Sequence, residues 1–139
     1  MAELFDYQGR WQTLVDRAVS DYDALTPEEK VWYNAQVLTQ SIDNGGLISY
    51  YYNSHADRLD ECLSALDTIR AQKMKKLMKR MNGLFPGGVP KDITKRNRVI
   101  DSWPDGDEDF DEKMDALEDE ASEECGHVEM LLADYIKRK

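Results

Sequence analysis

Cysteine and histidine side chains carry much of the chemistry of catalytic and metal sites, and the sequence has two of each: Cys62, Cys125, His55 and His127. A structural zinc site needs four ligands close together, whereas Cys125 and His127 lie far along the chain from the other two. No cysteine and histidine have a spacing typical of nucleophilic catalysis, and the apolar neighbours of Cys62 predict a buried thiol. The sequence therefore predicts no catalytic residue and no metal ligand, and we expect neither an enzyme nor a bound cofactor.

An acidic run invites a calcium-loop interpretation, because Asp105, Asp107 and Asp109 match the alternating ligands at the start of an EF-hand. That loop needs glycine at its sixth position and glutamate at its twelfth, where this chain has Phe110 and Ala116. The helix dipole also favours acidic residues before and within a first helical turn. We therefore expect the start of a helix here rather than a calcium site.

The most distinctive signal is the acidic stretch between Asp101 and Glu129, which holds 14 acidic residues and one basic residue, Lys113. An apolar stripe at 110, 114, 117 and 121 would face a core. At ~100° per residue, five carboxylates then share the opposite face. This set is called the acidic stripe below: Glu108, Glu112, Asp115, Asp119 and Glu123.

The acidic stripe would place a carboxylate about every 5 to 6 Å along about 22 Å of helix. Like charges at this spacing destabilise a helix by about 0.2 to 0.5 kcal/mol per pair, so the pattern works against stability. A solvated face that keeps the protein soluble is one interpretation. The other is a row of anions that a groove built for DNA phosphates would accept, since duplex DNA presents one charge per ~1.7 Å of its axis.

Charge is distributed unevenly over the 139 residues, whose formal net charge is −10. Residues 1–69 carry 4 basic and 12 acidic side chains, residues 70–98 carry 10 and 1, and residues 99–139 carry 4 and 15. The acidic balance argues against direct binding of nucleic acid. We find no apolar run long enough to span a membrane and no signal peptide, so we expect a cytoplasmic protein that does not bind membranes.

Helical patterns run through the whole chain. Apolar residues at spacings of three and four predict a first helix over about residues 6–23, with an inner face formed by Trp11, Leu14, Val15, Ala18, Val19 and Tyr22. A second helix is expected to start at a capping box between Thr26 and Glu29 and to stop at Asn44-Gly45-Gly46.

Further helices are predicted at 47–53, 59–69, 74–84 and 93–100, the last capped by Asp92. Two apolar stripes follow residue 107, and Ser122 or Gly126 is expected to separate two helices there. The basic residues at 70–80 predict an amphipathic helix whose charges are solvated or pair with acids of the same fold or of a second subunit. The expected fold is all-α, one compact domain over residues 1–139 with about six to eight helices, some short.

Two segments, Glu29–Leu38 and Ile42–Asn53, resemble the signature of a bacterial family of small acidic helical domains that was first catalogued as having unknown function. The founding characterised member of that family is a DNA mimic. The resemblance covers about residues 25–137 and continues through Ala65-Leu66, Ile69, Leu84-Phe85-Pro86, Val89-Pro90 and Tyr135-Ile136.

The resemblance implies an all-helical fold that is often dimeric and has no known catalytic residues. It also implies that surface carboxylates occupy the DNA-binding face of a transcription factor and so relieve repression. The chain departs from the family in having Leu47 where phenylalanine is usual, and in its basic segment 70–98. We expect Asn44, Gly45 and Gly46 to serve the fold by ending a helix rather than to form a ligand loop.

The sequence therefore predicts a non-catalytic protein that binds a basic protein partner, such as a DNA-binding protein, through the acidic stripe. Two alternatives remain open. A toxin-neutralising immunity protein would also be small, acidic and non-catalytic. An uncharacterised enzyme or metal-binding domain would need polar side chains that converge in a cleft.

Overall fold

The computed structural model describes residues 4–104 and 106–138, and every regular element in those residues is a helix. Seven are α-helices: α1 (Gln8–Asp21), α2 (Pro27–Gly45), α3 (Leu47–Tyr51), α4 (Leu59–Thr68), α5 (Gln72–Asn82), α6 (Ile93–Asp101) and α7 (Glu108–Arg138). Three are short 3-10 helices: η1 (Leu4–Tyr7), η2 (Tyr22–Ala24) and η3 (Ser54–Arg58). The prediction of a single all-α domain with six to eight helices is confirmed.

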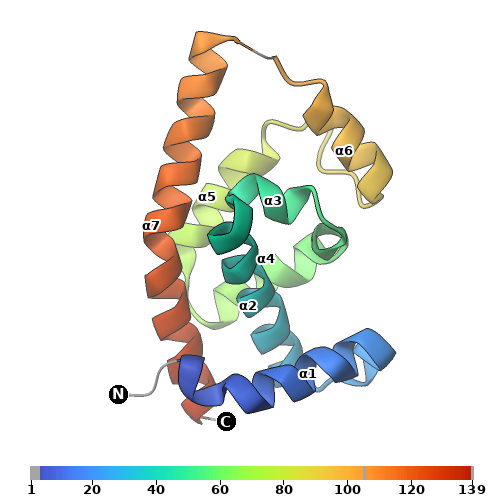
Figure 1. Cartoon of the computed structure of the whole chain (residues 1–139), viewed down its shortest axis with the longest axis vertical. Helices are drawn as coiled ribbons and strands as arrows, with labels where there is room; N and C mark the ends of the chain where they lie inside the picture. Colours follow the sequence, from blue (N-terminus) through green and yellow to red (C-terminus); the bar gives the residue numbers. More distant parts are fainter. Residues whose placement is uncertain (1–3, 105, 139) are drawn as a thin grey trace.

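The core is built around α2, which packs against α1, α3, α4 and α7. Helix α7 runs along one side of the molecule, and α1 crosses the end where both termini lie (Figure 1). Trp32, Ala35, Leu38 and Ile42 recur at spacings of three and four along α2 and are all buried. One face of α2 therefore supplies the apolar surface on which the other helices assemble.

Helix α1 docks on α2 through aromatic rings. The Trp11 ring stacks on Tyr33 at a centroid distance of 5.9 Å, and Leu14 and Ala18 continue the buried stripe. The prediction that Val19 belongs to the inner face is wrong, because its side chain is 80% exposed. The contact of α1 is a narrow stripe, and Val19 lies ~100° around the helix from Ala18 and faces solvent.

Side chains that cap helix starts lie where the sequence predicts them. The Thr26 hydroxyl accepts the Glu29 N–H at 3.1 Å, and the Glu29 carboxylate accepts the Thr26 N–H at 2.9 Å, which completes the capping box of α2. The Asp92 carboxylate accepts the Thr94 N–H at 2.7 Å at the start of α6. Each bond satisfies a backbone donor that lacks a partner within the helix.

The last helix corrects one expectation. Neither Ser122 nor Gly126 separates two helices, because α7 is continuous from Glu108 to Arg138. Its two apolar stripes join, since Ala121, Cys125 and Val128 are all buried at spacings of three and four. A glycine inside a helix costs ~1 kcal/mol relative to alanine, and burial of the neighbouring apolar side chains offsets this cost.

The Asn-Gly-Gly motif ends α2 and starts α3. Gly46 has φ 87° and ψ 174°, a backbone conformation that is essentially restricted to glycine, and its N–H donates to the Ile42 carbonyl at 2.8 Å. The Glu118 carboxylate of α7 lies against Gly46 and accepts the Leu47 N–H at 2.7 Å. Burial raises the pKa of Glu118, and so do the nearby carboxylates of Asp115 and Asp119, although its backbone hydrogen bonds act in the opposite direction.

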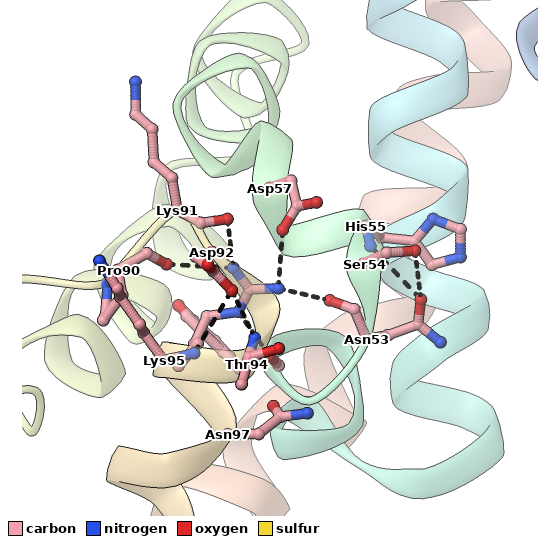
Figure 2. A network of polar contacts seen from close by, with 12 residues as sticks. Asn53, Ser54, His55, Asp57, Pro90, Lys91, Asp92, Thr94, Lys95 and Asn97 are labelled. Carbon is pink, nitrogen blue, oxygen red and sulfur yellow. Dashed lines mark hydrogen bonds and ion pairs between the residues drawn. The ribbon is translucent and has the colours of Figure 1, made fainter.

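Arg96 of α6 is fully buried, donates four hydrogen bonds to backbone carbonyls and forms an ion pair with Asp57. Its side chain nitrogens lie 2.7 to 3.0 Å from oxygens of five residues: the carbonyls of Tyr51, Asn53, Pro90 and Lys91 and the carboxylate of Asp57. Figure 2 shows Pro90 and Lys91 on one side of this cluster and Asn53 and Asp57 on the other. The guanidinium therefore joins the end of α3, η3, the segment before α6 and α6 itself.

The first prediction concerns two glycines in different backbone conformations. Replacing Gly46 with alanine should destabilise the fold by about 1 to 3 kcal/mol, because its φ is unfavourable for other residues and a Cβ would clash with the Glu118 carboxylate. Replacing Gly126 with alanine should instead stabilise it by about 0.5 to 1 kcal/mol, since its Cβ would meet nothing within 4 Å. Chemical denaturation measures both free energies of unfolding, and equal effects would contradict the assignment of Gly46 as the cap.

The second prediction concerns Arg96. Replacing it with methionine should destabilise the fold by about 3 to 5 kcal/mol, because four backbone carbonyls lose their donors and the Asp57 carboxylate, which is partly exposed, loses its ion pair. Lysine should rescue less than half of this loss, since an ammonium group cannot reproduce the planar fork of five donors. The control is Arg98→Met at an exposed position of the same helix, for which we expect a change within about 0.5 kcal/mol. Similar losses for Arg96→Met and Arg98→Met in thermal or chemical unfolding would contradict this role.

Candidate protein-binding surface

Helix α7 carries the whole acidic stripe. The Asp107 carboxylate accepts the Phe110 N–H at 3.0 Å, which fixes the first turn of the helix. All five carboxylates of the acidic stripe follow from there and are exposed to solvent. The start of α7 stands beyond the ends of α3 and α5 (Figure 1), so its first turns are accessible.

The carboxylates of the acidic stripe have no protein partner within the part of the chain that the structure describes. None of the five accepts a hydrogen bond or forms an ion pair there. Three other acids of α7 are engaged: Glu118 with the Leu47 N–H, Glu120 with Arg80 at 2.8 Å, and Glu124 with Lys73 at 3.8 Å. The acidic stripe is therefore part of the acidic charge on α7 that contacts among the described residues leave unneutralised, together with Asp109, Asp111, Glu129 and Asp134.

Five of the ten basic residues in segment 70–98 form ion pairs with acids of the same chain. Helix α5 packs beside α7, and its Lys73 and Arg80 face Glu124 and Glu120. Lys75 forms an ion pair with Asp67 at 2.5 Å. Of the alternatives for this segment, the structure shows pairing within the fold for these five cations. None of them forms an ion pair with the acidic stripe among the described residues.

The histidine and cysteine side chains of the described residues do not come together in one site. No group of three or more His, Cys, Asp or Glu side chains is placed to hold a metal ion among them. Asp105, the first residue of the calcium-loop interpretation, lies outside the described residues. His127 contacts Glu124 at 2.6 Å, and His55 is half-buried on η3.

Both thiols are buried in separate parts of the core. Cys62 lies beside the Asn34 carbonyl, and Cys125 beside the Thr39 carbonyl. Burial raises the pKa of each thiol to about 12. The predicted buried thiol at Cys62 is confirmed, and both cysteines fill core space.

Sequence reasoning missed Glu118, Glu120, Glu124 and Arg96 as residues that organise this surface. A signal for Arg96 exists, because it shares a helix face with Ile93 and Ile100, which are partly buried. An arginine on an apolar face indicates a buried, paired guanidinium. The partners of the three glutamates lie on other helices, and the periodicity of α7 alone does not distinguish them from the other acids.

Comparisons with known proteins identify one family. The family model described as DMP19-like protein matches residues 23–139, which is most of the chain and leaves out α1. Neither the curated proteins nor the solved structures gave a match. Within the described residues, no helix combines the length and the apolar composition that crossing a membrane requires.

The third prediction concerns the two thiols. With a pKa of about 12, only about one thiol in ten thousand is ionised at pH 8. Iodoacetamide should therefore leave Cys62 and Cys125 unmodified in the native protein and alkylate both in denaturant, as intact-mass spectrometry would show. Native alkylation at the rate of a free cysteine would show that one thiol is accessible and reactive.

Proposed function

This chain belongs to the DMP19-like family, named for DNA mimic protein 19, and we propose that it acts without catalysis as a DNA mimic that binds a basic DNA-binding protein. The acidic stripe forms the binding surface, and the partner is a protein such as a transcription regulator. The chain itself binds neither nucleic acid nor membrane. Occupation of the partner's DNA-binding surface excludes DNA and so changes the partner's activity.

The observation that carries this proposal is the row of five exposed, unpaired carboxylates on one face of α7. Like charges at these spacings destabilise the helix by about 0.2 to 0.5 kcal/mol per pair, and no cation among the described residues relieves them. A groove lined by lysine and arginine would relieve this repulsion. Binding then replaces a repulsion in the free protein by an attraction in the complex.

The dimensions of the acidic stripe suit this partner. Its carboxylates recur about every 5 to 6 Å over about 22 Å, which is the length of about six to seven base pairs of duplex. Exposed charges are screened over about 8 to 10 Å near physiological ionic strength, so several must act on the partner at short range. A rigid helix holds all five in one line, as a phosphate backbone holds its charges.

The fourth prediction tests the acidic stripe directly. Changing its Glu residues to Gln and its Asp residues to Asn should leave the fold intact or slightly more stable, because helix repulsion falls. Affinity for the basic partner should fall at least about tenfold, or about 1.4 kcal/mol, and wild-type affinity should decrease with salt. The partner is isolated by pull-down from the native cell with elution by rising salt, and calorimetry then measures the affinity of the purified pair.

A matched control separates the acidic stripe from net charge alone. The control changes five exposed acids that belong to other helices to their amides, which alters the net charge equally: Asp16, Asp21, Asp23, Glu28 and Asp60. We expect this variant, and one with Lys73, Lys76 and Arg80 changed to Gln, to retain the wild-type affinity. A partner that binds the stripe variant as tightly as the wild type would show that the acidic stripe is only a solvated face.

Competition with duplex DNA distinguishes mimicry from other protein binding. If this chain occupies the DNA-binding surface of its partner, adding the chain must release DNA from that partner. Variants of the acidic stripe that bind the partner more weakly must release less DNA at the same concentration. A partner that never binds DNA and that kills cells when expressed alone would instead identify a toxin-neutralising immunity protein. Fluorescence anisotropy of a labelled duplex provides the measurement.

A further inference from the structure

A hollow of about 370 Å³ lies beside the Asn-Gly-Gly motif, with walls from α1, α2, α3 and η3. Its volume falls within the range of about 300 to 1,000 Å³ that is typical of small-molecule sites. Its polar side is lined by seven residues: Tyr33, Gln40, Ser41, Asn44, Ser49, Asn53 and His55. Gly46 ends α2 through its backbone, and the Asn44 side chain takes no part in that cap. The Asn44 side chain lines this hollow instead.

The lining carries no fixed charge. None of the described residues around the hollow is Asp, Glu, Lys or Arg, although 33% of the chain is charged. Burial and the nearby Arg58 lower the pKa of His55, so its imidazole is neutral at pH 7. A charged ligand would lose hydration without gaining a counter-ion from the lining. A neutral polar ligand needs only hydrogen bonds, which the lining can supply.

Several hydrogen-bonding groups of the lining are uncommitted. The side-chain amides of Gln40 and Asn44 make no hydrogen bond within the described residues. Asn53 accepts the His55 N–H at 3.3 Å through Oδ1, which leaves its Nδ2 donors available. In Figure 2 the His55 ring and the Asn53 side chain turn toward α2, away from Asp57 and Lys91. Each carboxamide offers a donor and an acceptor side by side.

The base of the hollow is apolar and aromatic. Trp11 and Val15 of α1 and Val37 of α2 contribute to it, and the Trp11 ring stacks on Tyr33 with an interplanar angle of 28°. Trp11 and Val37 are nearly buried, so Val15 and Tyr33, which are partly exposed, form the apolar surface that a ligand ring would meet beside the carboxamides. Helix α1 precedes the residues that match the family model. Trp11 and Val15 therefore line the hollow from outside the matched segment.

We propose that this hollow binds an uncharged planar ligand whose edge carries a hydrogen-bond donor beside an acceptor, as a nucleobase or a ring carboxamide does. Gln40 and Asn44 pair with that edge, in the way that side-chain amides pair with adenine. The ring lies over the apolar base. The site is independent of the acidic stripe, which lies on another helix.

The test titrates the full chain with nicotinamide and adenosine and follows backbone, side-chain amide and indole N–H signals by two-dimensional NMR. A saturable shift of the Asn44, Gln40 and Trp11 signals is expected with at least one of them. A larger saturable shift with nicotinamide would identify the ring carboxamide as the recognised group. A larger shift with adenosine would identify the nucleobase. Nicotinate, which has the shape of nicotinamide and a negative charge, should bind at least about tenfold more weakly than nicotinamide.

Two variants and one control complete the test. Asn44→Leu and Gln40→Leu should each weaken binding at least about tenfold, and both should fold, because these exposed side chains make no hydrogen bond within the described residues. Gln8→Leu alters an exposed amide of α1 that does not line the hollow and should bind like the wild type. No saturable shift up to ~10 mM of either probe, equal binding of nicotinate and nicotinamide, or undiminished binding by Asn44→Leu would overturn the proposal.

Discussion

A buried guanidinium needs hydrogen-bond acceptors and a counter-charge, and Arg96 finds four backbone carbonyls and the Asp57 carboxylate in distant parts of the chain. Its contacts hold the end of α3, η3 and the segment before α6 together. Helix α6 then leads into Trp103, whose ring packs on Phe85 at 5.1 Å and on Phe110 at 5.6 Å. Phe110 lies in the first turn of α7, so these ring contacts connect the segment after α6 with the start of the helix that carries the acidic stripe.

The rotation of α7 about its own axis decides which of its acids face solvent, and burial of its apolar stripe sets that rotation, with polar contacts on both sides of the stripe. Glu118 accepts the first backbone N–H of α3, while Glu120 and Glu124 lie against the cations of α5. At ~100° per residue, Glu118 lies about 60° to one side of the buried stripe, and Glu124 and Glu120 lie about 60° and 100° to the other side. The face opposite the core is then left to the acidic stripe, whose carboxylates have no such partner among the described residues.

The acidic residues behind the net charge of −10 have two different roles in this fold. Some join helices through ion pairs, and those of the acidic stripe do not. Ion pairs between α5 and α7 use acids to join helices, at exposed or partly exposed sites where each pair contributes roughly 0 to 1 kcal/mol. The acidic stripe contributes no such attraction and destabilises its own helix. A charged row that persists at a cost to stability favours a binding role, and this is the basis on which the proposed DNA mimicry rests.

Local patterns in the sequence determined the helices, the capping box at Thr26, the Asp92 cap, the glycine end of α2 and the common face of the acidic stripe. These features depend on residues within one or two turns of one another, and their spacing is visible along the chain. Sequence reasoning placed Val19 in the core and divided α7 near Ser122 or Gly126, because periodicity shows neither how wide a contact is nor whether neighbouring stripes join. Only the tertiary structure decided the partners of Arg96, Glu118, Glu120 and Glu124, since each pairs with a group brought close by folding. The same is true of the hollow beside Asn44, whose walls come from four helices that are not all adjacent in sequence.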